Sequence, residues 1–230
     1  MRILGLIPAR GGSKGIPGKN IKPLAGKPLV AYTFDSVQES KYLTQTVVST
    51  DDKEIAETCK SVGLEVPFMR PDDLAADKSP TLPVIKHALE FFAAQGQTFD
   101  AVCLLQVTSP FRESGLIDKA IEKFIETGAD ALVSVLAVPH EYNPHWVFEP
   151  TENGFLKIAT GEDEIITRRQ ALPQAFIRDG AIYITKTEVI LNQNSLYGKT
   201  LSYIENKSDI HVNLDTMDDW AKAEQLLNKL

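Results

Sequence analysis

Residues 7–20, with the sequence IPARGGSKGIPGKN, combine four glycines with three cationic side chains. The donors in this segment are the N–H groups of Gly11, Gly12, Ser13 and Gly15 and the side chains of Arg10, Lys14 and Lys19. Successive N–H groups of a tight loop form an anion-binding nest, and long cationic side chains strengthen it. A triphosphate carries several negative charges and suits this set of donors. A solvated glycine turn is the other interpretation, but the three cations directly after an apolar run favour phosphate binding.

Two common phosphate-binding motifs do not match this segment. In the Walker A motif, a glycine precedes the Gly-Lys pair by five positions and a Ser or Thr follows the pair. Here Ser13 and Asn20 occupy those two places. No G-x-G-x-x-G dinucleotide fingerprint can be aligned either. The segment therefore predicts phosphate binding without assigning the nucleotide.

Polar residues also follow two later apolar runs. The first of these runs ends in Asp51 and Asp52, which could contact a ligand or simply cap the next helix. The second ends in a polar cluster, namely Gln106, Thr108, Ser109 and Arg112. A glutamine that leaves a buried strand at the ligand-binding edge of a sheet favours a ligand contact. The Ser109-Pro110 pair could instead start the next helix.

The segment HVNLDTMDDW (211–220) contains candidate metal ligands. Its alternation predicts a short strand, on which Asn213 and Asp215 project to the same face. Two oxygen ligands placed in this way can share Mg²⁺, which keeps most of its waters and bridges phosphate oxygens. Asp215 could equally cap the last helix, and this segment alone does not decide between the two interpretations.

The segment TRRQALPQAFIRDGAIYI (167–184) carries Arg168, Arg169 and Arg178. A charge cluster is usually a solvated face. These arginines are flanked by apolar residues and lead into an expected strand, which favours binding of an acidic acceptor.

The elements that must position these residues alternate along the chain. Apolar runs predict strands at 3–9, 46–50, 64–69, 101–106, 131–138, 181–185 and 201–206. Helical periodicity predicts helices at 29–40, 52–63, 82–96, 114–128 and 216–230, with a short one before the last strand. Strands that are apolar throughout and joined by crossover helices predict a mostly parallel sheet covered on both faces, a three-layer α/β sandwich.

Residues 139–180 interrupt this alternation with turn residues and short β-like pieces. An irregular excursion of this length inside a compact domain is usually functional or an interface. Its apolar residues are too many for so short a segment to bury alone, namely Trp146, Val147, Phe148, Phe155 and Leu156. Because exposed apolar patches mark interfaces, we expect a single domain with an inserted subdomain that forms a homodimer.

The composition excludes several classes of protein. The 230-residue chain has a net charge of −7, which argues against a general nucleic-acid binder. Its apolar runs are too short for a signal peptide or a membrane span. Its two cysteines match no metal spacing, and a structural disulfide is not expected. These features predict a cytoplasmic protein.

Taken together, the motifs resemble those of the acylneuraminate cytidylyltransferases, which include CMP-sialic acid synthetases and their bacterial nonulosonate relatives. The resemblance covers nearly the whole chain through IPARGGSKGIPGKN, VVSTDD, RPDDLAADKSPT, LLQVTSPFR, RRQALPQAFIRDGAIYI and LDTMDD. It implies a nucleotide-diphospho-sugar transferase (GT-A-like) fold and a homodimer. It also implies Mg²⁺-dependent transfer of CMP from CTP to the anomeric hydroxyl of an acidic keto-sugar, with release of pyrophosphate, for cell-surface polysaccharide biosynthesis.

The resemblance also implies roles for individual residues. The implied nucleotide-binding residues are Ala9, Arg10, Gly11, Gly12, Ser13, Lys19, Asn20, Arg70 and Thr81, the last two on the cytosine side. The implied sugar-facing or dimer-arm residues are Gln106, Arg169, Gln170, Arg178 and Tyr183. Asp215 matches the second of the family's two metal-binding aspartates. Arg10, Lys19 and Asp215 are therefore the expected catalytic residues.

The chain departs from the family pattern at two places. Asn213 stands where the first metal aspartate is expected, and an amide oxygen brings less charge to Mg²⁺. Residues 142–149 contain His145 and Trp146 where sialate enzymes carry a lysine-containing stretch. This second difference favours a less hydroxylated acceptor, of the legionaminate or pseudaminate type.

The expected reaction is in-line attack of the sugar's C2 hydroxyl on the α-phosphorus of CTP. Arg10, Lys19 and the loop amides would stabilise the departing pyrophosphate, and Asp215 with Asn213 would hold Mg²⁺. Three alternatives stay open: a CMP-3-deoxy-octulosonate synthetase, a nucleotidyltransferase for a sugar phosphate, and a nucleotide-binding homologue that has lost catalysis. Asn213 is the feature that favours the last of these.

Overall fold

The computed structural model describes residues 1–77, 79–208 and 210–228. These residues divide into two compact units. The larger consists of Met1–Ser134 and Asp179–Leu230, and the smaller of Val135–Arg178. The smaller unit corresponds to the excursion predicted at 139–180, with bounds a few residues earlier.

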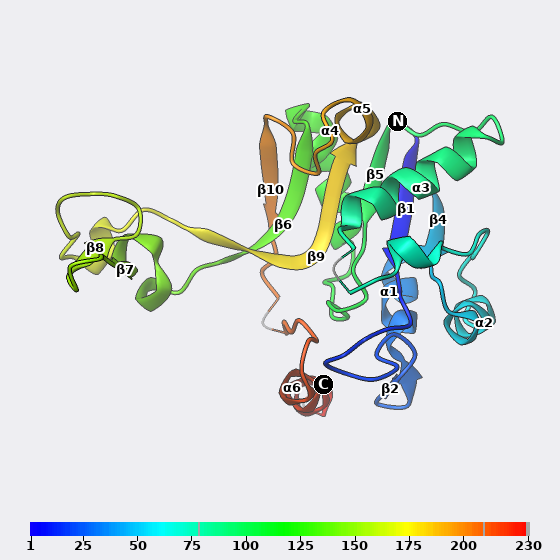
Figure 1. The fold of residues 1–230 in the computed structure, drawn as a ribbon, viewed down its shortest axis with the longest axis horizontal. Coiled ribbons are helices and arrows are strands. Elements are labelled where there is room, and N and C mark those ends of the chain that lie inside the picture. The colour runs from blue at the N-terminus through cyan, green and yellow to red at the C-terminus, as the bar shows by residue number, and fades with distance from the viewer. Residues whose placement is uncertain (78, 209, 229–230) are drawn as a thin grey trace. The chain divides into compact units, whose positions relative to one another are not determined.

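A six-stranded sheet forms the centre of the larger unit, in the order β10-β6-β9-β5-β1-β4 (Figure 1). Its strands are β1 (Ile3–Pro8), β4 (Leu43–Ser49), β5 (Ala101–Leu104), β6 (Ala131–Ala137), β9 (Phe176–Lys186) and β10 (Leu201–Glu205). Strand β1 runs parallel to both β4 and β5, whereas β9 runs antiparallel to β5. The predicted mostly parallel sheet is confirmed, and β9 is its antiparallel member.

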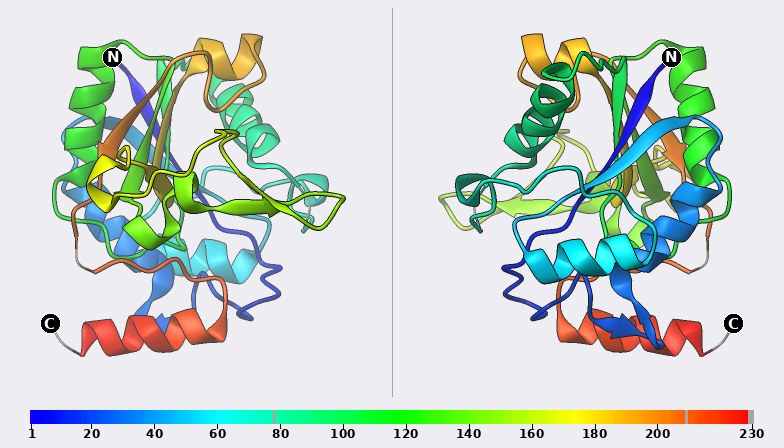
Figure 2. Two further views of the ribbon diagram at one scale, coloured as in Figure 1. Left: turned by 90° about the vertical axis from the view of Figure 1, so that its left-hand side faces the viewer. Right: turned by 90° about the vertical axis from the view of Figure 1, so that its right-hand side faces the viewer.

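Helices cover both faces of this sheet (Figure 2). They are α1 (Leu29–Gln38), α2 (Lys53–Ser61), α3 (Thr81–Ala93), α4 (Leu116–Thr127), α5 (Thr187–Asn192) and α6 (Met217–Leu227). The apolar cluster on one face contains side chains of α3 and α5, and the cluster on the other contains side chains of α1, α2, α4 and α6. Strand β1 supplies Leu4 and Leu6 to the first cluster and Ile3 and Ile7 to the second. Because successive side chains of a strand point to opposite faces, a sheet buried on both faces requires such a continuous apolar run.

Several predicted elements differ from the observed ones. Residues 64–69 form no strand and pair with β4 and the residue after it through isolated bridges, Val47 to Glu65 and Thr50 to Met69. Residues 211–215 are also not a strand. Helix α2 ends before Gly63. The φ of Gly63 is +98°, a conformation that favours glycine. A side chain at this position would also clash with the Phe34 ring. The last two residues of the predicted helix 216–230, Lys229 and Leu230, lie outside the described residues.

Short elements complete the two units. In the larger unit, β2 (Pro23–Leu24) pairs with β3 (Lys27–Pro28), and the short 3₁₀ helix η1 (Asp72–Leu74) lies between α2 and α3. In the smaller unit, β7 (Phe148–Pro150) pairs with β8 (Leu156–Ile158) beside the turns η2 (His140–Tyr142), η3 (Pro144–Trp146) and η4 (Arg169–Ala171). Both cysteines are buried and free, as expected. Within the described residues, no helix has the length and apolar character needed to cross a bilayer.

Candidate functional site

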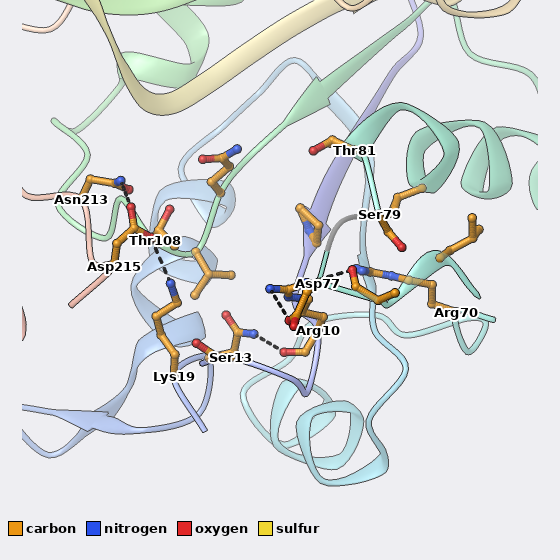
Figure 3. A pocket seen from close by; sticks show the side chains of 17 residues that line it. Arg10, Ser13, Lys19, Arg70, Asp77, Ser79, Thr81, Thr108, Asn213 and Asp215 are labelled. Atoms are coloured by element: carbon orange, nitrogen blue, oxygen red, sulfur yellow. Dashed lines mark hydrogen bonds and ion pairs between the residues drawn. The ribbon is translucent and has the colours of Figure 1, made fainter. Parts of the chain in front are cut away.

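A cavity of about 330 Å³ opens in the larger unit where the parallel strands β1, β4 and β5 end (Figure 3). Segments that are far apart in the sequence line it: the glycine loop after β1, the loop and helix start from Arg70 to Val84, residues 106–108 after β5, and the 213–215 segment. Ligands of open α/β sheets bind at this edge because the connecting loops diverge there. The cavity therefore collects most of the motifs that the sequence singled out.

Carboxylates from the end of β4 hold the start of the glycine loop. The Gly11 N–H donates to Asp51 Oδ1 at 3.1 Å. Asp52 caps α2 by accepting from the N–H groups of Glu54 and Ile55, and its side chain leaves no room for a Cβ at Gly11. Both aspartates therefore have structural partners, and the Gly11 N–H is engaged within the protein.

Arg10 and Lys14 converge on one carboxylate that the motifs had not singled out, that of Asp77. An Arg10 guanidinium nitrogen lies 3.3 Å from Asp77 Oδ1, and a second donates to the carbonyl of Ala76 at 2.9 Å. Lys14 Nζ pairs with the other Asp77 oxygen and is the main cause of the lowered pKa of Asp77. Asp77 lines the cavity together with Arg10. In the sequence, the only signal for Asp77 is the acidic character of residues 72–77, and this alone does not indicate which cations Asp77 contacts.

Lys19 ties the end of the glycine loop to the 213–215 segment. Its Nζ donates to the carbonyl of Leu214 at 2.7 Å and lies 3.4 Å from Asp215 Oδ1. A Cβ at Gly15 would come within 2.1 Å of the Asp215 carbonyl oxygen, so the loop passes this segment at backbone distance. Glycine at position 15 is therefore required by the close approach of two chain segments.

Asn213 and Asp215 lie together although no strand holds them. Asn213 Nδ2 donates to Asp215 Oδ2 at 2.7 Å. Helix α6 is capped by Thr216, which forms a capping box with Asp219, so the cap is not Asp215. Asp215 is therefore available to the cavity, which it lines with Asn213. No set of three or more His, Cys, Asp or Glu side chains gathers at one point within the described parts of the chain.

Arg70 and Thr81 line the side of the cavity opposite Asn213 and Asp215 (Figure 3). Arg70 is buried, with 5% of its surface exposed, and its Nε donates to Ser49 Oγ at 3.1 Å. Burial lowers the pKa of its guanidinium, and the nearby Asp51 acts in the opposite direction. Arg70 is thus fixed in place while still contributing to the cavity lining.

The polar cluster after β5 divides into two pairs. Gln106 and Thr108 line the cavity. Arg112 is half-buried and donates to the carbonyls of Gln106 and Ala181 and to Thr33 Oγ1; loss of solvation lowers its pKa to about 10. Ser109 is buried, and no helix starts at the Ser109-Pro110 pair, since α4 begins at Leu116.

Of the other sequence-predicted residues, only some line the cavity. Ser13 and Asn20 do, and Asn20 Nδ2 also donates to the Arg10 carbonyl at 2.8 Å. Ala9 is buried beneath the loop, and Tyr183 packs against the apolar cluster on the α3 side of the sheet. The remaining sugar-side residues are exposed on the smaller unit, namely Arg169, Gln170 and Arg178.

The sheet and its cavity define a class, the three-layer α/β proteins that bind a nucleotide at the carboxyl ends of parallel strands. The family model described as cytidylyltransferase matches residues 4–228, and the chain belongs to this family. It is 38% identical over 230 residues to the CMP-N,N'-diacetyllegionaminic acid synthase of Legionella pneumophila, covering 99% of this chain and 97% of that protein. It is 32% identical over 226 residues to the pseudaminic acid cytidylyltransferase of Campylobacter jejuni, covering 98% and 96%.

A solved structure supports the fold assignment. The CMP:2-keto-3-deoxy-manno-octonic acid synthetase complexed with CTP superposes with a TM-score of 0.75 at 14% identity, covering 100% of this chain and 99% of that one. The predicted fold class is confirmed by this likeness, and the predicted resemblance to the acylneuraminate cytidylyltransferases is confirmed by the family match and its relatives.

Proposed function

We propose that this protein transfers CMP from CTP to the anomeric C2 hydroxyl of an acidic nonulosonic sugar and releases pyrophosphate. The observation that carries the proposal is the cavity, in which Arg10 and Lys19 of the glycine loop face the strand-end residue Gln106 and the carboxylate of Asp215. The names of the relatives, a legionaminic acid synthase and a pseudaminic acid cytidylyltransferase, support the reaction and the acceptor class.

The reaction is an in-line displacement at the α-phosphorus. The C2 hydroxyl oxygen of the sugar forms the new bond to the α-phosphorus and releases its proton to solvent. The bond from the α-phosphorus to the bridging oxygen of the β-phosphate breaks, and pyrophosphate leaves with its electron pair. Arg10, Lys19 and amides of the glycine loop would stabilise the charge on this leaving group, while Arg70 and Thr81 would face the cytosine. Gln106 would contact the sugar, with Arg169, Gln170, Arg178 and Tyr183 as the further sugar-side residues.

The residues present suit a bound Mg²⁺ ion. Mg²⁺ needs only one or two carboxylates from the protein when substrate phosphates complete its coordination. Asp215 lines the cavity with a partly exposed side chain, and Asn213 adjoins it. These two residues would hold the ion, which would supply Lewis-acid stabilisation of the α-phosphate charge.

A panel of acceptors tests the proposal. Pyrophosphate release from CTP is measured with N,N'-diacetyllegionaminate, pseudaminate, N-acetylneuraminate and 3-deoxy-octulosonate. We expect the legionaminate type to give the highest kcat/KM, because the most similar relative named above uses it and because residues 142–149 favour a less hydroxylated sugar. A clear preference for N-acetylneuraminate or 3-deoxy-octulosonate would contradict this acceptor. CTP binding without pyrophosphate release from any acceptor would contradict the enzymatic proposal and support a non-catalytic nucleotide-binding protein.

We also propose that the protein works in the cytoplasm as a homodimer, in the activation of sugars for cell-surface polysaccharides. The support for the dimer is the exposed apolar surface of the smaller unit. Its exposed apolar side chains are Tyr142, Val147, Phe148, Phe155, Leu156, Ile165 and Ile177. A patch of this kind is typical of an interface between subunits.

A further inference from the structure

A buried carboxylate lies outside the cavity, at the residue where the chain re-enters the larger unit. Asp179 is 2% exposed. Its Oδ1 accepts from the Ala181 N–H at 2.9 Å and from the Ser134 hydroxyl, and its Oδ2 accepts from Asn206 Nδ2 at 3.1 Å. Burying a charge is costly unless it is paired and hydrogen-bonded, and three donors satisfy this one. Asp179 is thus an anchor that joins β9, β6 and the connection after β10.

A half-buried cation, Arg112, extends this network to the cavity. The Arg112 guanidinium donates to the carbonyl of Ala181 at 3.1 Å and to the carbonyl of Gln106. The charge of Asp179 also favours the protonated form of Arg112 and so raises its pKa, against the larger effect of burial. The network therefore extends from the Asp179 carboxylate to the backbone of the cavity-lining residue Gln106.

The next residue, Gly180, faces the same part of the cavity wall. Its φ is +79°, a conformation that glycine adopts without the cost of a Cβ. A Cβ at this position would lie 3.2 Å from Ser109 Oγ, 3.4 Å from Gln106 Oε1 and 3.8 Å from Asn213 Oδ1. Ser109 Oγ in turn donates to the Asp179 carbonyl at 3.2 Å. A Cβ at 180 would therefore crowd Ser109 Oγ and come into van der Waals contact with Gln106 and Asn213, which line the cavity.

We propose that Asp179 and Gly180 form a positioning element for the sugar acceptor. Asp179 fixes the backbone of β9, and Gly180 leaves the space in which Ser109 and the Gln106 side chain keep their positions. Neither residue touches the nucleotide side, where Arg10, Arg70 and Thr81 lie. The inference rests on the proposed function, since it assigns the Gln106 side of the cavity to the acceptor.

Gly180→Ala tests this element, with Gly128→Ala as the matched control. Gly128 has a φ of +62° and no atom within 4 Å of a built Cβ, so its substitution introduces comparable backbone strain without crowding the cavity. We expect Gly180→Ala to raise the acceptor KM by about threefold or more, because its Cβ would shift Ser109 and the adjoining Gln106 by tenths of an ångström and a misplacement of about 1 Å can cost about 10²-fold. The CTP KM should stay within about twofold. Gly128→Ala should lower the melting temperature and leave both KM values unchanged.

Asp179→Asn and Ser134→Ala keep the inference testable if Gly180→Ala does not fold. Both variants weaken the anchor from the side opposite the cavity, and calorimetric CTP binding reports whether each is folded. We expect an increased acceptor KM at unchanged CTP affinity, larger for Asp179→Asn. This inference would be overturned if the acceptor KM were equal in wild type, Gly180→Ala and Asp179→Asn. It would also be overturned if the acceptor KM and the CTP KM rose equally in the variants. Neither result would contradict the proposed function. A wild-type protein that turns over none of the acceptors would overturn the proposed function and this inference with it.

Discussion

Arg10 and Lys19 are both cations of the glycine loop, but their surroundings differ. Lys19 pairs with the Leu214 carbonyl and with Asp215, which suits a residue that holds the 213–215 side of the cavity in place. Arg10 is paired with Asp77, at the surface of the cavity, where a phosphate can compete with a carboxylate for the guanidinium. Since exposed ion pairs contribute little stability, the Asp77 pair is a weak competitor for a multiply charged ligand.

Substitution of Arg10 should therefore affect catalysis far more than folding. We expect Arg10→Ala to lower kcat/KM by about 10²–10³-fold, the usual effect of removing one donor to developing negative charge. The melting temperature should change little, and pyrophosphate release with saturating acceptor is the measurement. Lys14→Ala is the matched control, because Lys14 pairs with the same Asp77 but is 83% exposed and does not belong to the cavity lining. Near-wild-type activity of Arg10→Ala would contradict the phosphate role of the loop.

At the scale of elements, the connection from β10 to α6 positions Asn213 and Asp215 without regular structure. The Leu214 N–H donates to the Thr108 carbonyl at 2.8 Å, which attaches the connection to the end of β5. The capping box of α6 follows at once, with Asp219 Oδ2 accepting from the Thr216 N–H at 2.9 Å and from its hydroxyl at 2.8 Å. These hydrogen bonds, the Thr216 hydroxyl first, lower the pKa of Asp219. The start of the helix thus fixes where Asp215 stands.

Removal of this cap should cost stability in a pH-dependent way. We expect Thr216→Ala to reduce the free energy of unfolding by about 1 kcal/mol near neutral pH, the typical value of an N-cap. A carboxylate with a lowered folded-state pKa stabilises the fold above its unfolded pKa and loses that effect as the pH falls through the folded value. Urea unfolding of wild type and variant, compared at pH 7 and at progressively acidic pH, should therefore show a difference that shrinks on acidification. A difference that is constant across this range would contradict the role of the ionised Asp219.

At the scale of the whole molecule, the smaller unit exposes apolar surface that its two-stranded sheet does not bury. Phe155 and Leu156 are 74% and 68% exposed. Two-stranded hairpins are marginally stable in water by themselves, and a second copy of the chain would cover such a surface. The Trp146 indole is held inside this unit, where its N–H donates to the Ile166 carbonyl at 2.6 Å.

Charge placed on this surface should separate the subunits. We expect the wild type to sediment with twice the mass of one chain at micromolar concentration, and Phe155→Glu combined with Leu156→Glu to sediment as a monomer. Leu201→Glu is the control, because Leu201 is 50% exposed on the larger unit and its substitution should leave the mass unchanged. A wild-type protein with the mass of one chain would contradict the homodimer.

The sequence by itself determined the layered fold and predicted the loop proposed to bind phosphate, because both depend on local patterns. A continuous apolar run such as 3–7 indicates a strand that is buried on both faces. Four glycines with three cations indicate an anion-binding loop from the local sequence alone. Only the tertiary structure decided what lies opposite that loop. The pairing of Arg10 with Asp77, the attachment of Lys19 to Leu214 and the placement of Gly180 beside Gln106 join residues 67 to 195 positions apart. No local pattern encodes such contacts, since they depend on how the sheet orders its strands and on which loops meet at its edge.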